Sequence, residues 1–120
     1  MRHRSAKNRL GKPPAQRRAM IRNLATSLAL HGHVTTTVAR AKVLSAYLER
    51  LVARVQNCND MNAIRFLAGY LYTSAASRLF LVQAREFKVK SGFIRCSKLG
   101  MRDGDSANMC YVSFVSSAQS

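Results

Sequence analysis

The most constraining feature of this sequence is a regular run of apolar residues between positions 38 and 56. Their spacings along the chain are 3, 4, 3 and 4 residues, and the members are Ala41, Leu44, Leu48, Leu51 and Val55. Because an α-helix completes a turn about every 3.6 residues, these spacings place all five side chains on one face of a helix. The run therefore predicts a helix over about 38–56 whose apolar face is buried in a core.

A second helix is predicted over about 14–31. Pro13 and Pro14 suit a first turn, where the missing N–H is not needed, and Gly32 suits the left-handed position that follows a helix. One stripe contains Met20, Ile21, Leu24 and Leu28, and the polar residues Arg17, Arg18, Arg22 and Thr26 lie largely outside it. We expect the stripe to face the core and the arginines to face outwards.

The remaining elements are shorter. The β-branched run from His33 to Val38 predicts a strand, after which Thr37 can cap the helix over 38–56. Asp60 can cap a helix over about 61–71, and Thr73 or Ser74 can start another that ends near Glu86. One kinked helix over both remains an alternative. The apolar sides of these two helices would be formed by Ile64, Leu67, Ala68 and Leu71, and by Ala75, Leu79, Phe80 and Val82.

The last third of the chain predicts a β-hairpin. Its strands would run from Phe93 to Leu99 and from Met109 to Val115, joined by a loop with two glycines and two aspartates. The predicted fold is thus α+β in two layers, in the order α-β-α-α-α-β-β, with a small mixed or antiparallel sheet of about three strands and helices on one face. We expect residues 1–13 to be a basic arm, 14–115 a single domain, and 116–120 a polar tail.

Charge narrows the functional class. The chain has 20 Lys and Arg against 5 Asp and Glu, a formal net charge of +15, and its first acidic residue is Glu49. Such an imbalance implies a polyanionic partner, nucleic acid before an anionic membrane. No apolar run is long enough to cross a bilayer, and we expect no secretory signal and no membrane partner.

The basic residues form two groups that we predict to bind RNA. Arginine suits bidentate phosphate contacts, and no recognition-helix or zinc-finger pattern favours a DNA operator. The arm and the first helix contribute Arg2, His3, Arg4, Lys7, Arg9, Lys12, Arg17, Arg18 and Arg22, and the hairpin region contributes Lys88, Lys90, Arg95, Lys98 and Arg102.

No pattern predicts a catalytic or metal site. Phosphate-binding loops and Ser–His–Asp arrangements are missing, and the hairpin loop lacks the ligand spacing of a calcium loop. Cys58, Cys96 and Cys110 lack zinc-ligand spacing, so we expect free thiols in a reducing compartment, with Cys96 and Cys110 buried opposite each other across the hairpin. His31 and His33 have no third ligand nearby. We therefore expect no metal, no cofactor, no small-molecule substrate and no enzyme activity.

Several blocks of residues, in order along the chain, carry a family resemblance. They are Met1-Arg2-His3-Arg4, Leu10-Gly11, Arg17-Arg18-Ala19-Met20, Arg22 to Leu28, His31-Gly32, Thr35-Thr36-Thr37, Ala39 to Lys42, Leu79-Phe80, Lys98-Leu99-Gly100, Arg102, Gly104-Asp105, Ala107 and Met109. On these blocks the chain resembles the family of the bacterial-type large ribosomal subunit protein seventeen. Residues 57–77 resemble it least.

The resemblance implies an α+β structural constituent of the large ribosomal subunit. It implies binding to large-subunit ribosomal RNA by phosphate and shape contacts near the polypeptide exit tunnel, beside neighbouring ribosomal proteins. It also adds Thr36 and Lys42 to the expected RNA-binding residues.

Two alternatives and the compartment stay open at this point. The chain could instead be a non-ribosomal architectural nucleic-acid-binding protein that coats DNA, or a cationic protein of membrane surfaces. The acid-free, arginine-rich start is compatible with a mitochondrial matrix signal. The chain also departs from the family in the hairpin: Ser91 to Arg95 stand where the family usually has a Gly-Gly-Tyr-Thr-Arg-like segment, and Ser113-Phe114 stand where an acidic residue is common. These departures and the basic start lead us to expect a mitochondrial ribosome rather than one in a bacterial cytoplasm.

Overall fold

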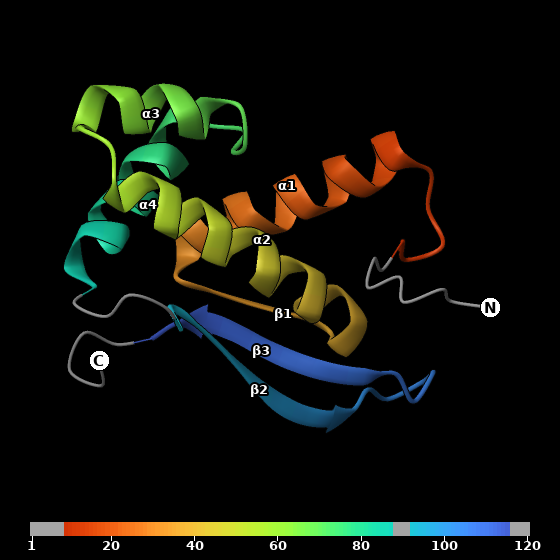
Figure 1. Ribbon diagram of the computed structural model, residues 1–120. Helices are drawn as coiled ribbons and strands as arrows, with labels where there is room; N and C mark the ends of the chain where they lie inside the picture. The colour runs from red at the N-terminus through yellow and green to blue at the C-terminus, as the bar shows by residue number, and fades with distance from the viewer. Residues whose placement is uncertain (1–8, 88–91, 116–120) are drawn as a thin grey trace, which may run out of the picture.

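The computed structural model describes residues 9–87 and 92–115. Within these ranges four helices lie on one side of a three-stranded sheet (Figure 1). The elements are α1 (Pro14–His31), β1 (His33–Thr37), α2 (Val38–Gln56), α3 (Asp60–Ala68), α4 (Ser74–Glu86), β2 (Ile94–Met101) and β3 (Asn108–Phe114). The predicted α+β class and element order are confirmed.

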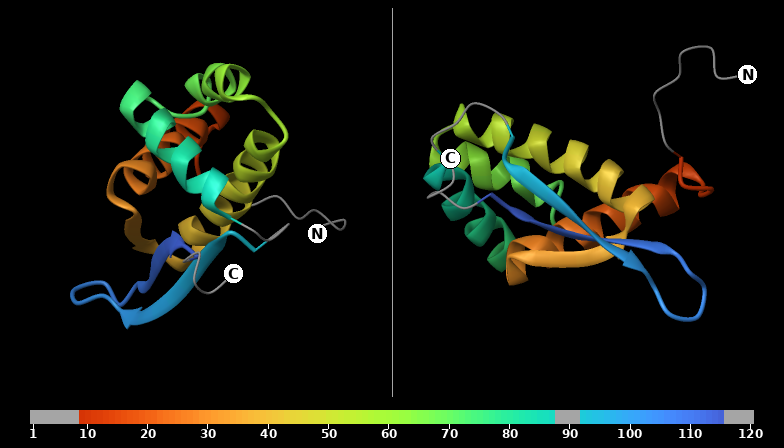
Figure 2. Two further views of the ribbon diagram at one scale, coloured as in Figure 1. Left: turned by 90° about the vertical axis from the view of Figure 1, so that its left-hand side faces the viewer. Right: turned by 90° about the horizontal axis from the view of Figure 1, so that it is seen from below.

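The sheet is antiparallel throughout, with strand order β1-β3-β2. His33 pairs with Ser113 on one side of β3, and Ile94 pairs with Phe114 on the other. A register shift between Lys98 and Gly100 interrupts the β2–β3 pairing. Beyond this shift the hairpin loop projects past the helices (Figure 2). Among the described residues, helices cover one face of the sheet and leave the other face open.

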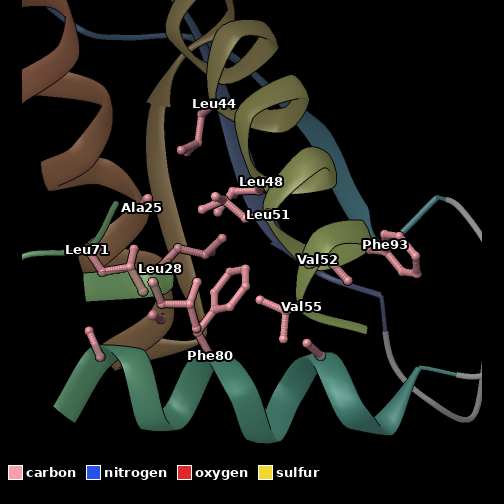
Figure 3. Packing of buried hydrophobic residues seen from close by; sticks show 14 of the residues in the cluster. Ala25, Leu28, Leu44, Leu48, Leu51, Val52, Val55, Leu71, Phe80 and Phe93 are labelled. Carbon is pink, nitrogen blue, oxygen red and sulfur yellow. The ribbon is translucent and has the colours of Figure 1, made fainter. Parts of the chain in front are cut away.

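Helix α2 supplies the centre of the core. All five residues of its predicted stripe are buried, and Val52 joins them with no exposed surface. Figure 3 shows the side chains of α2 from Leu44 to Val55 between α4, α1 and the sheet, with Phe80 of α4 and Phe93 near the start of β2 at the same core. The 3-4 spacing thus marks a helix that packs against both the other helices and the strands.

Helix α1 ends as the sequence predicts. Gly32 has a φ of 80° and its N–H donates to the carbonyl of Leu28 at 2.7 Å, which completes the last turn. Thr26, expected outside the apolar stripe, is instead buried. Its hydroxyl donates to the carbonyl of Arg22 at 2.8 Å and accepts the N–H of Tyr72 at 3.0 Å. A contact with a residue 46 positions away has no signature in the local pattern.

The boundary after α2 differs from the prediction in detail. The cap of α3 is Asn59, not Asp60, and its side chain accepts the N–H of Asn62 at 2.9 Å. The helix ends at Ala68, so Leu71 is buried beyond the helix rather than within it. Helices α3 and α4 are separate, because the Thr73 hydroxyl accepts the N–H of Ala76 and begins a new helix.

The buried face of α4 is not the one predicted. Leu79 and Val82 are 45% and 55% exposed, and Ala75 is exposed as well. Of the predicted set only Phe80 is buried, and it is accompanied by smaller residues: Ala76, Ser77 and Ala84, with Leu81. Alanine and serine therefore occupy much of the packed face, and of the large apolar residues in the predicted set only Phe80 marked it.

The two hairpin cysteines are offset rather than opposite. Cys96 pairs with Val112 and Cys110 pairs with Lys98. Cys110 is buried but Cys96 is exposed, so the prediction that both thiols are buried is wrong for Cys96. Partial burial, followed by the neighbouring Cys110 thiol, raises the pKa of Cys96. All three cysteines are free, as expected.

We expect Leu48→Ala to lower the free energy of unfolding by about 2–5 kcal/mol, because it leaves a cavity beside a helix packed on both sides. Leu79→Ala is the matched control, and its half-exposed site predicts a loss below about 0.5 kcal/mol. Urea denaturation followed by circular dichroism measures both. Equal losses in the two variants would contradict the assignment of the core.

Candidate nucleic-acid interface

The few acidic residues are used mostly for internal contacts. Asp60 forms an ion pair with Arg85 at 3.1 Å, and Asp105 pairs with Arg102. The Glu49 carboxylate accepts the backbone N–H of Ile94 at 2.9 Å, which ties α2 to the start of β2. The Asp60–Arg85 and Asp105–Arg102 contacts are the two ion pairs among the described residues. The cations on α1 therefore have no acidic partner there.

Helices α1 and α2 and the turn after α3 enclose a groove of about 640 Å³. Its polar lining consists of Arg17, Arg18, Arg22, Arg50, Tyr47, Tyr70 and Tyr72. We call this the arginine–tyrosine groove. No acidic residue of the described chain lines it, so its potential is positive. Arg18 and Arg50 are exposed, and Arg17 is half-buried.

Arg22 has a structural role in this groove. Its Nη2 donates to the carbonyls of Ala68 and Leu71, at 3.0 and 3.1 Å, and the guanidinium lies 4.3 Å from the centre of the Tyr72 ring. Its Nε is buried without a partner among the described residues. The guanidinium therefore holds the turn after α3 against α1 and does not face outwards as expected.

The tyrosines are fixed by their neighbours. The Tyr47 hydroxyl donates to the carbonyl of Tyr70 at 3.0 Å, and the Tyr70 ring packs at 4.7 Å from Phe66. Burial raises the pKa of Tyr47 to about 12, although the charge of Arg22 opposes the rise. The Tyr47 phenol thus stays protonated and keeps donating its hydrogen bond.

Arg50 and the three tyrosines of the groove were not predicted from the sequence. They come from α2 and from residues 70–72, which are brought together only by the tertiary fold. The one local signal was the pair of tyrosines at positions 70 and 72, next to Gly69 in a stretch with little resemblance to the family.

The cations of the hairpin do not form one patch. Arg95 pairs with Ser113, and Lys98 pairs with Cys110. Since Arg95 and Lys98 are three residues apart on one strand, their side chains point to opposite faces of the sheet. Arg102 lies in the projecting loop, where Asp105 accepts hydrogen bonds from its guanidinium. The expected second patch is therefore spread over the hairpin.

The other predicted residues fall into three classes. Arg9 and Lys42 are exposed, and Lys12 is half-buried just before α1. Thr36 is only 6% exposed on the helix-covered side of the sheet, so its side chain is not presented to an external partner. Six predicted residues lie outside the described ranges: Arg2, His3, Arg4, Lys7, Lys88 and Lys90.

The open face of the sheet carries an aromatic pair. His33 of β1 stacks on Tyr111 of β3 with ring centres 5.3 Å apart and an angle of 15° between the planes. Arg95 lies on the same face, because it and His33 both pair with Ser113. This flat surface is separate from the arginine–tyrosine groove, which lies among the helices.

Two other kinds of site are missing from the described ranges. No three His, Cys, Asp or Glu side chains come together there as a metal site requires. No helix in that part of the chain is long and apolar enough to span a bilayer.

The family model and the similar proteins all indicate the same family. The model of the family described as Ribosomal protein L17 matches residues 20–115. The chain is 37% identical over 117 residues to Large ribosomal subunit protein bL17 of Porphyromonas gingivalis, covering 96% of this chain and 72% of the relative. It is 36% identical over 121 residues to the protein of the same name from Nautilia profundicola, covering 96% and 98%. The corresponding protein of Campylobacter jejuni is 35% identical over 117 residues, covering 96% and 99%.

The Arg102–Asp105 pair gives a pH prediction. The hydrogen bond from Arg102, followed by the N–H of Ala107, lowers the pKa of Asp105 from 3.8 to about 2. Because the pKa is lowered by folding, the stabilisation is present above pH 4 and is lost as the pH falls through about 2. We expect carboxyl chemical shifts to give a midpoint near 2 that Arg102→Ala moves towards 3.8. Arg95→Ala, which removes the same charge from the hairpin, should leave the midpoint unchanged; an equal shift would contradict a direct pair.

Proposed function

The chain belongs to the ribosomal protein L17 family, and from this premise we propose that it binds large-subunit ribosomal RNA through the arginines of α1. As a family member it is a structural protein of the large ribosomal subunit and not an enzyme. Its partners are accordingly ribosomal RNA and other ribosomal proteins. We further propose that the α1 arginines form the surface of this chain that contacts the RNA.

The observation that carries the proposal is the exposure of unneutralised arginine on α1. Arg17 and Arg18 adjoin the groove, and no acidic side chain of the described residues pairs with either. Two adjacent guanidinium groups in this setting suit bidentate contacts with phosphate oxygens. The net charge of +15 would also be compensated by a polyanion, which favours a tightly held RNA partner.

The finer expectations belong to the same proposal. We infer that residues 1–13 act as a basic arm on the RNA, that 14–115 form the folded domain, and that 116–120 form a polar tail. A position near the polypeptide exit tunnel, beside neighbouring ribosomal proteins, is supported by the family resemblance. If the surface neutralises about eight phosphates, the log–log slope of affinity against salt is about −6 to −7.

The relatives do not support the compartment that we expected from the sequence. Those named above are bacterial, so the comparisons do not support the expected preference for a mitochondrial ribosome. They support a ribosomal location alone. The alternative of a free protein that coats DNA has no support from these relatives, and sedimentation distinguishes the two.

We expect Arg17→Glu combined with Arg18→Glu to abolish most incorporation into the large subunit, because the pair would then repel phosphate. Mass spectrometry of sucrose-gradient fractions after a high-salt wash measures the share of the chain that co-migrates with the subunit. Arg65→Glu combined with Arg78→Glu makes the same change of charge at exposed positions of α3 and α4 and serves as the control.

Thermal melting should be similar for both double variants, since none of these four residues is buried. Normal incorporation of the α1 variant would contradict the proposed surface. Equal loss in both variants would show that total charge, not the α1 surface, determines assembly. A wild-type chain found only at the top of the gradient would favour the DNA-coating alternative.

A further inference from the structure

We propose that the arginine–tyrosine groove holds one unpaired nucleotide of the RNA, with its base against the tyrosines and its phosphate on the arginines. The inference rests on the proposed RNA-binding function and adds the form of RNA that this site accepts. It separates the groove from the rest of the basic surface, where phosphate contact alone is expected.

The size of the groove suits one nucleotide. Its volume of about 640 Å³ lies within the range of about 300–1,000 Å³ that is usual for small-molecule sites. A base in a continuous duplex is stacked and paired, so it cannot enter a concave site between two helices. An unpaired base of a loop or bulge can leave its stack and insert, which is the usual form in which proteins read RNA bases.

The wall formed by residues 70–72 offers aromatic surface at fixed positions. Tyr72 and Tyr70 remain 46% and 38% exposed. Yet the Tyr72 ring is held by the guanidinium of Arg22, and the backbone of Tyr70 is held by the hydroxyl of Tyr47. Aromatic groups that are already ordered lose little entropy when a base packs on them.

The sides of the groove that come from α1 and α2 offer positive charge. Arg17 and Arg18 lie on α1 and Arg50 lies on α2, so cations border the groove on two sides. The hydrogen bond from Arg50 is a 3.4 Å contact from Nε to the carbonyl of Ala46 within its own helix. The guanidinium groups are therefore placed to receive a phosphate whose base lies on the tyrosines.

Tyrosines distinguish a nucleotide from other anions. An acidic peptide would use the arginines but gain little from the exposed rings. A nucleotide combines a planar base with a phosphate about one sugar away, which matches a groove with rings on one wall and cations on the others. The absence of acidic side chains from the described lining fits both anions, so the rings decide between them.

The test compares two RNAs with the full-length chain. The probes are fluorescently labelled hexauridylate, which is unpaired, and a labelled RNA duplex of twelve base pairs, both followed by fluorescence anisotropy at fixed salt. We expect Tyr72→Leu to weaken hexauridylate binding about tenfold, as the loss of one stacked base predicts, with duplex affinity changed less than twofold. Tyr72→Phe should restore binding.

Tyr111→Leu is the matched control. Tyr111 is 36% exposed on the open face of the sheet, away from the groove, so its loss should leave hexauridylate affinity unchanged. A loss larger than that of Tyr72→Leu would overturn the inference and place the base on the sheet. Circular dichroism melting shows whether each variant is folded.

A second measurement needs no substitution in the groove. The chain has four tyrosines and no tryptophan, and three of the four tyrosines line the groove, so its fluorescence reports mainly on this site. Hexauridylate should quench the tyrosine emission of the wild-type chain and of Tyr111→Leu, whereas the duplex should not. Equal quenching by both RNAs would overturn the inference.

The remaining outcomes separate this inference from the function on which it rests. If the wild-type chain binds neither RNA, the proposed function fails and the inference fails with it. If it binds both but Tyr72→Leu is unaffected, only the inference fails. Displacement of hexauridylate by an equal concentration of hexaglutamate would also overturn it, by assigning the groove to acidic peptides.

Discussion

The structure depends on the burial of α2 between the sheet and the other helices. Leu44 and Leu48 are fully buried along this helix, and the core extends from them to Phe80 on one side and Phe93 on the other. The half-buried side chains of α2 then position the neighbouring parts. Glu49 binds the first N–H of β2, while Tyr47 binds the carbonyl of Tyr70. One buried helix thereby sets the location of both the hairpin and the groove.

The shortage of acidic residues is a second constraint. With five carboxylates for twenty cations, the chain cannot neutralise its own surface. Three of the five carboxylates make contacts that hold segments together: Asp60 joins the start of α3 to α4, Asp105 closes the hairpin loop, and Glu49 anchors β2. The repulsion that remains on α1 disfavours the isolated chain, and the RNA contact that we propose would relieve it. On that proposal the same charges affect both stability and function.

Local pattern predicted the elements better than their contacts. The predicted ranges 14–31 and 38–56 coincide with α1 and α2. Proline, glycine and a regular apolar stripe are local signals, because each reports on the helix in which it lies. The prediction of the buried face of α4 was wrong, because much of that face is alanine and serine, which give little periodic hydrophobic signal. Among the candidate site residues, Thr36 is buried and Arg22 holds a turn 46 to 49 residues away. Such contacts depend on which distant segments pack together, and the residue spacing within one helix does not predict this.

The contrast between Arg22 and its neighbours on α1 shows how position decides the role of an arginine. Arg22 lies beside the turn after α3, where two carbonyls and the Tyr72 ring take up its guanidinium. Arg17 and Arg18 lie about one helical turn before Arg22, and there α1 borders the groove. The groove therefore combines a wall from α1 with a wall from residues 69–72. Because Arg22 joins the two walls, a substitution in the turn after α3 would alter the shape of the groove and leave Arg17 and Arg18 at their places on α1.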